Sequence, residues 1–79
     1  MQNIENIKVL GLGCKSCHAF LENVKEAVKE KGLNIEVEYV TDLEKIMAYG
    51  AMSMPVLVIN DQVVTMGKVL SSKEIMKYL

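Results

Sequence analysis

The chain has 79 residues, of which 51% are hydrophobic and 24% charged, so it is expected to form one small globular domain over residues 1–79. Its net charge is −1 and its basic residues are dispersed, which argues against a nucleic-acid partner. The longest apolar run is far shorter than the roughly 18 residues of a membrane-spanning helix, and the N-terminus lacks a basic region followed by an apolar one. We therefore expect no membrane partner and a cytoplasmic location.

The first half of the sequence predicts a strand, a helix and a second strand. Residues 4–10 end in a short β-favouring run and are expected to form the first strand. Apolar residues then recur at helical spacing from Cys17 to Val28, and Gly32 ends the predicted helix. Residues 34–40 alternate between apolar and polar side chains, as in a strand at a sheet edge. Such a strand-helix-strand unit requires a right-handed parallel crossover.

Two capping-box patterns mark further helices in the second half. Thr41 and Glu44 form one pattern ahead of a short helix that is expected to end at Gly50. Ser71 and Glu74 form the other pattern, at the start of a C-terminal amphipathic helix. Both helices are therefore expected to begin at a side-chain cap.

A β-hairpin is predicted between these two helices. Residues 56–59 and 62–66 are rich in β-favouring side chains and flank a turn at Asn60-Asp61. Because a hairpin is antiparallel and the first crossover is parallel, the sheet should be mixed. The expected order is β-α-β-α-β-β-α, an α/β fold with a four-stranded mixed sheet and three helices on its faces.

Both cysteines of the chain, Cys14 and Cys17, lie at the predicted turn from the first strand into the first helix. If Cys14 opens the helix, the two Cα atoms are about 5 Å apart, which a disulfide can span. The unpaired amides and the dipole of the helix start stabilise a thiolate on Cys14, with Lys15 as a nearby cation and Ser16 as a hydrogen-bond donor. Cys17 lies one turn further on, on the apolar side, so we expect it to be more buried.

Three features together resemble the thioredoxin superfamily, in particular its small, glutaredoxin-sized members. They are Gly13 to Cys17 at the turn, Ser53 to Val56 before the hairpin, and Gly67 ahead of the last helix. The resemblance covers essentially the whole chain and implies a thioredoxin-like fold. In that family the proline before the third strand is cis and faces the cysteine pair, and the residue before it pairs with an extended substrate. These roles fall on Pro55 and Met54.

The sequence departs from the pattern most familiar in that family, Trp-Cys-Gly-Pro-Cys. Gly13 stands where the tryptophan would be, and Lys15 and Ser16 lie between the cysteines. In thioredoxins proper a buried acid lies six residues before the first cysteine, whereas this chain has Lys8 there. We interpret Gly13, Lys15 and Ser16 as residues that support the cysteine pair.

The predicted activity is thiol–disulfide exchange through this redox-active disulfide. The Cys14 thiolate attacks a substrate disulfide, and Cys17 resolves the mixed disulfide and releases the reduced substrate. The expected substrate is a protein or small-molecule disulfide, and a separate reductase must supply electrons. We expect a monomer without a bound cofactor or metal that serves electron transport and cell redox homeostasis.

Two other functions remain open from the sequence: a metal-binding carrier or metallochaperone, and a redox sensor without turnover. A heavy-metal-binding domain also places CxxC after its first strand, but its element order ends on a strand. Two thiolates supply half of the four ligands of a zinc site, so a metal would need His18, a partner chain or a two-coordinate ion such as Cu(I). The string CxxCH, completed by His18, also matches a c-type haem attachment, which would require an exported chain.

The methionines divide into two predicted groups. Met47, Met66 and Met76 are expected to fill gaps in the core. Met54, beside the predicted proline loop, is expected to offer adaptable apolar surface to a partner. No sequence pattern assigns a catalytic role to any of the three tyrosines.

Overall fold

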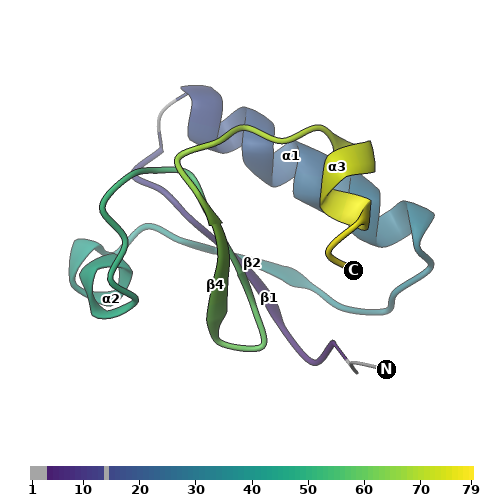
Figure 1. Ribbon diagram of the computed structural model, residues 1–79, viewed down its shortest axis with the longest axis horizontal. Coiled ribbons are helices and arrows are strands. Elements are labelled where there is room, and N and C mark those ends of the chain that lie inside the picture. The colour runs from purple at the N-terminus through teal and green to yellow at the C-terminus, as the bar shows by residue number, and fades with distance from the viewer. Residues whose placement is uncertain (1–3, 14) are drawn as a thin grey trace.

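The computed structural model describes residues 4–13 and 15–79, which form strands and helices in the predicted order. The elements are β1 (Ile7–Leu10), α1 (Lys15–Glu30), β2 (Val37–Val40), α2 (Leu43–Ala48), β3 (Val56–Ile59), β4 (Gln62–Met66) and α3 (Ser72–Met76). Figure 1 shows the course of the chain through these elements. The four strands form one sheet in the order β2-β1-β3-β4. The α/β fold with a four-stranded mixed sheet and three helices is therefore confirmed.

Strand pairing follows from the connections. β1 and β2 are parallel, because α1 carries the chain back across the sheet, and β2 lies at the edge as its alternating pattern predicted. β3 runs antiparallel to both β1 and β4. The β3–β4 hairpin turns at Asn60 and Asp61, whose φ angles are +51° and +62°. Both angles are positive, as a two-residue hairpin turn with the twist of the flanking strands requires.

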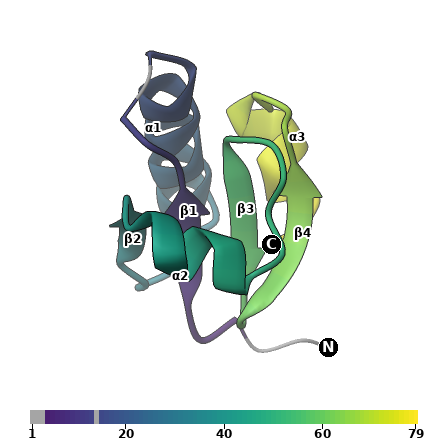
Figure 2. The same cartoon turned by 90° about the vertical axis from the view of Figure 1, so that its left-hand side faces the viewer.

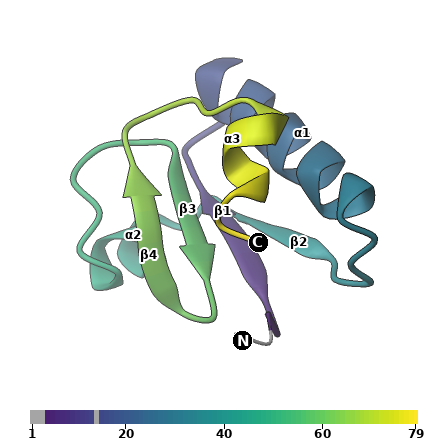
Figure 3. The same cartoon turned by 45° about the vertical axis from the view of Figure 1, so that its right-hand side comes forward.

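The helices cover both faces of the sheet. α1 and α3 lie side by side on one face, and α2 lies on the other (Figures 2 and 3). α1 turns its apolar stripe toward the sheet and buries the residues that its spacing predicted: Cys17, Phe20, Leu21, Val24, Ala27 and Val28. In the part of the chain that the structure describes, no helix is long and apolar enough to cross a membrane.

The first two strands begin three residues later than the sequence predicted. At the first strand the cause is a side chain distant in the chain. The Asn60 Oδ1 atom accepts hydrogen bonds from the backbone N–H groups of Glu5 and Asn6, at 2.7 and 3.3 Å. The hairpin turn thereby binds the segment before β1 through the Asn60 side chain, and the Asn60 N–H group also donates to the Asn6 carbonyl at 3.0 Å.

The predicted cap of α2 is wrong by one residue. Asp42, and not Thr41, is the N-cap, and its side chain accepts a hydrogen bond from the Glu44 N–H group at 3.0 Å. Asp is at least as good a cap as Thr, so the shift costs the helix nothing. Sequence patterns locate such a helix start only to within a residue or two.

The prediction that Met47 fills the core is also wrong. Its side chain is 65% exposed, because the six-residue α2 helix buries only Ile46. Met66, at the end of edge strand β4, is 37% exposed, whereas Met76 packs against the core cluster beneath α3. Short elements at the rim of the sheet therefore leave methionines on the surface.

The capping box of α3 yields a test of how this last helix is held. The Glu74 N–H group donates to Ser71 Oγ at 3.3 Å, and the Ser71 N–H group donates to Glu74 Oε1 at 3.4 Å. Ser71→Ala should lower the free energy of unfolding by about 1 kcal/mol, measured by urea denaturation. Ser72→Ala, at the first helical residue, is the matched control and should change it little. Equal losses in the two variants would show that the capping box does not stabilise α3.

Candidate active site

The predicted cysteine turn follows β1 at the edge of the sheet where β3 begins. Leu10, the last residue of β1, pairs with Val40 on one side and Val56 on the other. The next residue of the turn, Gly11, and the residue before β3, Pro55, therefore leave the sheet at the same edge. Open α/β sheets place their sites at the carboxyl ends of parallel strands. Cys14, the predicted nucleophile, lies outside the described residues.

Gly13 gives the turn a backbone conformation that favours glycine. Its φ angle is +84°, in the left-handed region, although a Cβ atom would meet nothing within 4 Å. The requirement is therefore for backbone freedom, not for space. The Gly13 N–H group donates a hydrogen bond to the Tyr39 hydroxyl at 3.0 Å, which ties the turn to β2.

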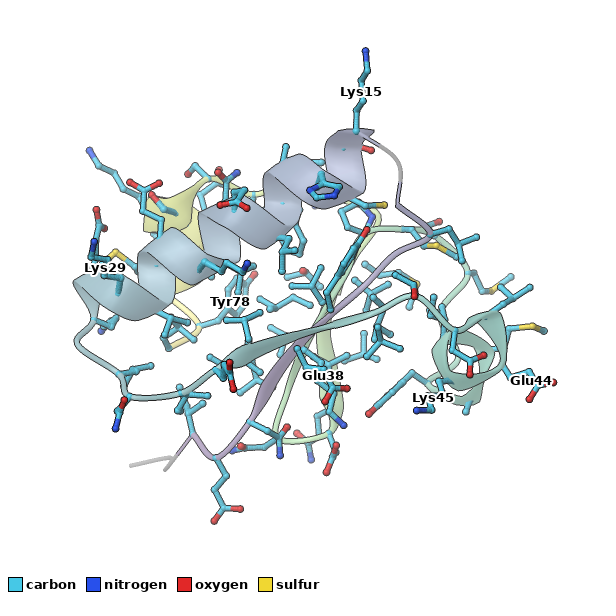
Figure 4. The ribbon with its side chains drawn as sticks, turned by 180° about the vertical axis from the view of Figure 1, so that it is seen from behind. Lys15, Lys29, Glu38, Glu44, Lys45 and Tyr78 are labelled. Atoms are coloured by element: carbon cyan, nitrogen blue, oxygen red, sulfur yellow. The ribbon has the colours of Figure 1, made fainter. Side chains whose placement is uncertain are left out.

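Lys15 and Ser16 begin α1 and are exposed. The Lys15 side chain extends away from the body of the protein at the end of the helix (Figure 4). Its ammonium group is therefore surrounded by solvent, where salt screens its field. We therefore expect Lys15 to have only a modest electrostatic influence on the start of α1.

Cys17 is completely buried in the first turns of α1. It packs against the end of β1 so closely that a Cβ atom at Gly11 would lie 2.8 Å from both the Cβ and the Sγ of Cys17. Real Cβ atoms do not approach other atoms so closely, so the absence of a side chain at position 11 lets the sulfur lie there. The burial of Cys17 agrees with its place on the apolar stripe of the helix.

Met54 and Pro55 lie beside the start of β3. The peptide bond between them is cis, Pro55 is buried and Met54 is half-buried. The Pro55 carbonyl accepts a hydrogen bond from the Gly67 N–H group at 2.9 Å, which binds the loop to the end of β4. On the same loop Met52 is 92% exposed. The loop therefore offers apolar side chains at the edge of the sheet where the cysteine turn lies.

Tyr39 contacts the cysteine turn, although no sequence pattern identified it as a site residue. Besides accepting from Gly13, its hydroxyl oxygen would lie 3.4 Å from a Cβ atom at Gly11, and its ring meets the His18 ring edge-on at 5.9 Å between centroids. Tyr39 pairs in register with Val9 and shares the α1 side of the sheet. Its place near the carboxyl end of a parallel strand is the signal that could have identified it.

Lys8 points to the opposite face of the sheet from Cys17. Its ammonium group donates hydrogen bonds to the Tyr49 hydroxyl at 3.1 Å and to Asp61 Oδ1 at 3.3 Å. These two hydrogen bonds raise the pKa of Lys8 above its usual value, and the bond to Tyr49 has the larger effect. The position where thioredoxins proper have a buried acid therefore holds a cation that joins β1 to α2 and the hairpin turn.

Metal ligands and buried charges can be assessed for residues 4–13 and 15–79. Within these ranges no three His, Cys, Asp or Glu side chains gather closely enough to hold a metal ion. No polar or charged residue in these ranges is buried, so no buried carboxylate stands beside Cys17 in this part of the chain.

Comparisons with known proteins identify thioredoxins as relatives of this chain. The model of the thioredoxin domain family matches residues 5–79. A thioredoxin from Methanothermobacter thermautotrophicus is 36% identical over 73 residues, which cover 92% of this chain and 95% of that protein. A thioredoxin from Methanocaldococcus jannaschii is 37% identical over 73 residues, which cover 92% of this chain and 84% of that protein.

The fold also has a counterpart among solved structures. A structure of thioredoxin-2, described as a component of the protein secretion machinery of the malaria parasite, superposes with a TM-score of 0.62. The match covers 99% of this chain and 84% of the other at 19% sequence identity, which supports the fold alone. The family model and the two archaeal relatives carry the assignment further: the chain belongs to the thioredoxin family, a family of thiol–disulfide oxidoreductases.

Proposed function

We propose that this protein exchanges disulfides through Cys14 as nucleophile and Cys17 as resolving cysteine. The observation that carries the proposal is the complete burial of Cys17 against Gly11. A buried sulfur cannot meet a bulky substrate disulfide, so the first attack must come from another thiol. Cys14 precedes it by three residues, about one turn of helix, and is the other cysteine of the chain.

The proposed reaction transfers two electrons in two steps. The Cys14 thiolate attacks one sulfur of the substrate disulfide, and the other substrate sulfur leaves as a thiolate that takes a proton from water. Cys17 then loses its proton to solvent and attacks the Cys14 sulfur. The Cys14–Cys17 disulfide forms, the bond to the substrate breaks, and the second substrate thiolate leaves. A reductase with a dithiol or equivalent donor restores both thiols.

The start of α1 supports a thiolate at the nucleophile. The first amide groups of a helix have no intrahelical acceptor, and the helix dipole places partial positive charge there. Both effects favour the charged form of a cysteine at this position. Gly13, whose N–H group donates to the Tyr39 hydroxyl, precedes this position.

The substrate is proposed to bind along the loop before β3. An extended segment would pair with the backbone of Met54, since the carbonyl of Pro55 already accepts the Gly67 N–H group. Met52 and Leu12, which are 92% and 55% exposed, offer apolar surface at this edge of the sheet. The substrate class is therefore a disulfide carried by a polypeptide or by a small molecule.

The proposed function extends to the form and the location in which the protein acts. We propose that residues 1–79 act as a single domain, as a monomer in the cytoplasm, and without a bound cofactor, a nucleic acid or a membrane. Its role would be electron transport from a reductase to disulfide substrates, and so cell redox homeostasis.

Trapping of mixed disulfides tests the division of labour between the cysteines. Cys17→Ser should retain one equivalent of glutathione after reaction with oxidised glutathione, because the Cys14 mixed disulfide cannot be resolved. Cys14→Ser should retain almost none, because the remaining thiol is buried. Intact-protein mass spectrometry measures both.

Denaturant supplies the control for that experiment. In a high concentration of urea the Cys17 thiol of Cys14→Ser becomes exposed and should react like any other thiol, which shows that burial alone protected it. If the two variants retain equal glutathione under native conditions, the assignment of nucleophile and resolving cysteine is wrong.

The effect of Lys15 on the nucleophile is expected to be small. Lys15→Glu should slow alkylation of Cys14 at neutral pH by less than about fivefold, because an exposed charge contributes only about 0.2–1 kcal/mol. Lys25→Glu is the matched control: it makes the same charge change on an exposed residue of the same helix, about 15 Å further along. A Lys15 effect that persists in high salt would contradict the view that this ammonium acts from solvent.

A further inference from the structure

Tyr39 connects β2 to both sides of the cysteine pair. Its hydroxyl oxygen accepts the N–H group of Gly13, the residue before Cys14, at 3.0 Å. Its ring meets edge-on the ring of His18, the residue after Cys17. One half-buried side chain thus holds the chain where it enters the turn and where it leaves it.

The same hydroxyl and the buried sulfur both adjoin Gly11. The position that a Gly11 Cβ atom would take is 2.8 Å from Cys17 Sγ and 3.4 Å from the Tyr39 oxygen, so both atoms flank one point at the end of β1. The ammonium group of Lys8 is turned away from this sulfur. The Lys8 ammonium binds Tyr49 and Asp61 on the opposite face of the sheet.

The resolving step would be favoured by a hydrogen-bond donor near the Cys17 sulfur. Cys17 must carry a negative charge before it attacks the Cys14 sulfur, and a buried charge is costly unless it is hydrogen-bonded. A phenolic hydroxyl can donate one hydrogen bond through its hydrogen and accept others through the lone pairs of its oxygen. The Gly13 bond uses one lone pair of Tyr39, so the hydrogen remains available to a neighbouring acceptor.

Building on the proposed function, we propose that Tyr39 is a positioning residue for the resolving step. Its hydroxyl holds the Gly13 amide and donates its own hydrogen toward the Cys17 sulfur when that sulfur is a thiolate. The proton of Cys17 leaves to solvent, the Cys14–Cys17 bond forms, and the substrate leaves as a thiolate. Tyr39 keeps its proton throughout and acts only through Cys17 and the turn.

A two-phase reaction with an aromatic disulfide separates the steps. Reduced protein mixed with 5,5′-dithiobis(2-nitrobenzoate) releases one coloured thiolate when Cys14 attacks and a second when Cys17 resolves the mixed disulfide. Tyr39→Phe removes only the hydroxyl and keeps the ring contact with His18. It should slow the second phase about tenfold or more, the value of a hydrogen bond to a charged group, and leave the first phase within about twofold.

Matched controls exclude a general effect of losing a tyrosine hydroxyl. Tyr78→Phe changes a 46% exposed residue after α3, and Tyr49→Phe changes the partner of Lys8 on the opposite face. Both variants should leave the two phases unchanged. The free energy of unfolding is measured in parallel, because a purely structural role would lower it for Tyr39→Phe without slowing the second phase.

The outcomes distinguish this inference from the function on which it rests. If the native protein releases only one thiolate, Cys17 does not resolve the mixed disulfide, and both the proposed function and the role of Tyr39 are overturned. If the native protein is biphasic and Tyr39→Phe has a second phase within about twofold of it, the role of Tyr39 alone is overturned. A slowed second phase with unchanged controls supports the inference.

Discussion

The contact between Gly11 and Cys17 joins the end of β1 to the first turns of α1, and the geometry of the turn depends on it. A side chain at position 11 would overlap the Cβ and Sγ atoms of Cys17. Because there is none, α1 can begin directly above the end of the strand and lay its apolar stripe along the sheet. The same contact leaves a buried sulfur one helical turn from the position of Cys14 in the chain.

The sheet brings a second segment to this edge through its mixed topology. β1 and β2 end there because they are parallel, and β3 begins there because it is antiparallel to β1. The loop with Met54 and Pro55 thereby lies at the carboxyl end of the parallel pair, held by the Gly67 N–H group. Strand order thus assembles a candidate thiol site and a candidate substrate surface from segments about 40 residues apart in the chain.

Sequence reasoning succeeded where the determinants are local. The stripe of α1, the Ser71 capping box and the turn at Asn60 each depend on residues a few positions apart, and each is present in the structure. The propensity rules were less exact for α2, where Thr41 and Asp42 are both good capping residues and the structure uses Asp42. Met47 was misplaced because the pattern does not show how little surface a six-residue helix covers.

Local sequence patterns did not predict the contacts between segments that are distant in the chain. Tyr39 reaches Gly13 across 26 positions, and it does so because the parallel register places it opposite Val9. Asn60 binds the Glu5 amide across 55 positions and shortens β1. Both contacts follow from strand register, which a single sequence specifies only through the assembled sheet. The sequence alone therefore did not identify Tyr39 as a site residue, because its position depends on how β1 and β2 pair.

Redox titration of the Cys14/Cys17 couple is the sharpest test of the proposed thiol–disulfide exchange. The protein is equilibrated in buffers of reduced and oxidised glutathione, with and without Zn(II) or Cu(I), and its thiols are then alkylated and weighed by mass spectrometry. If Cys14 and Cys17 form one redox couple, both thiols disappear together in one two-electron transition and no metal is retained. Glutathione bound to Cys14 while Cys17 remains a thiol, or one metal ion held tightly per chain, would contradict it.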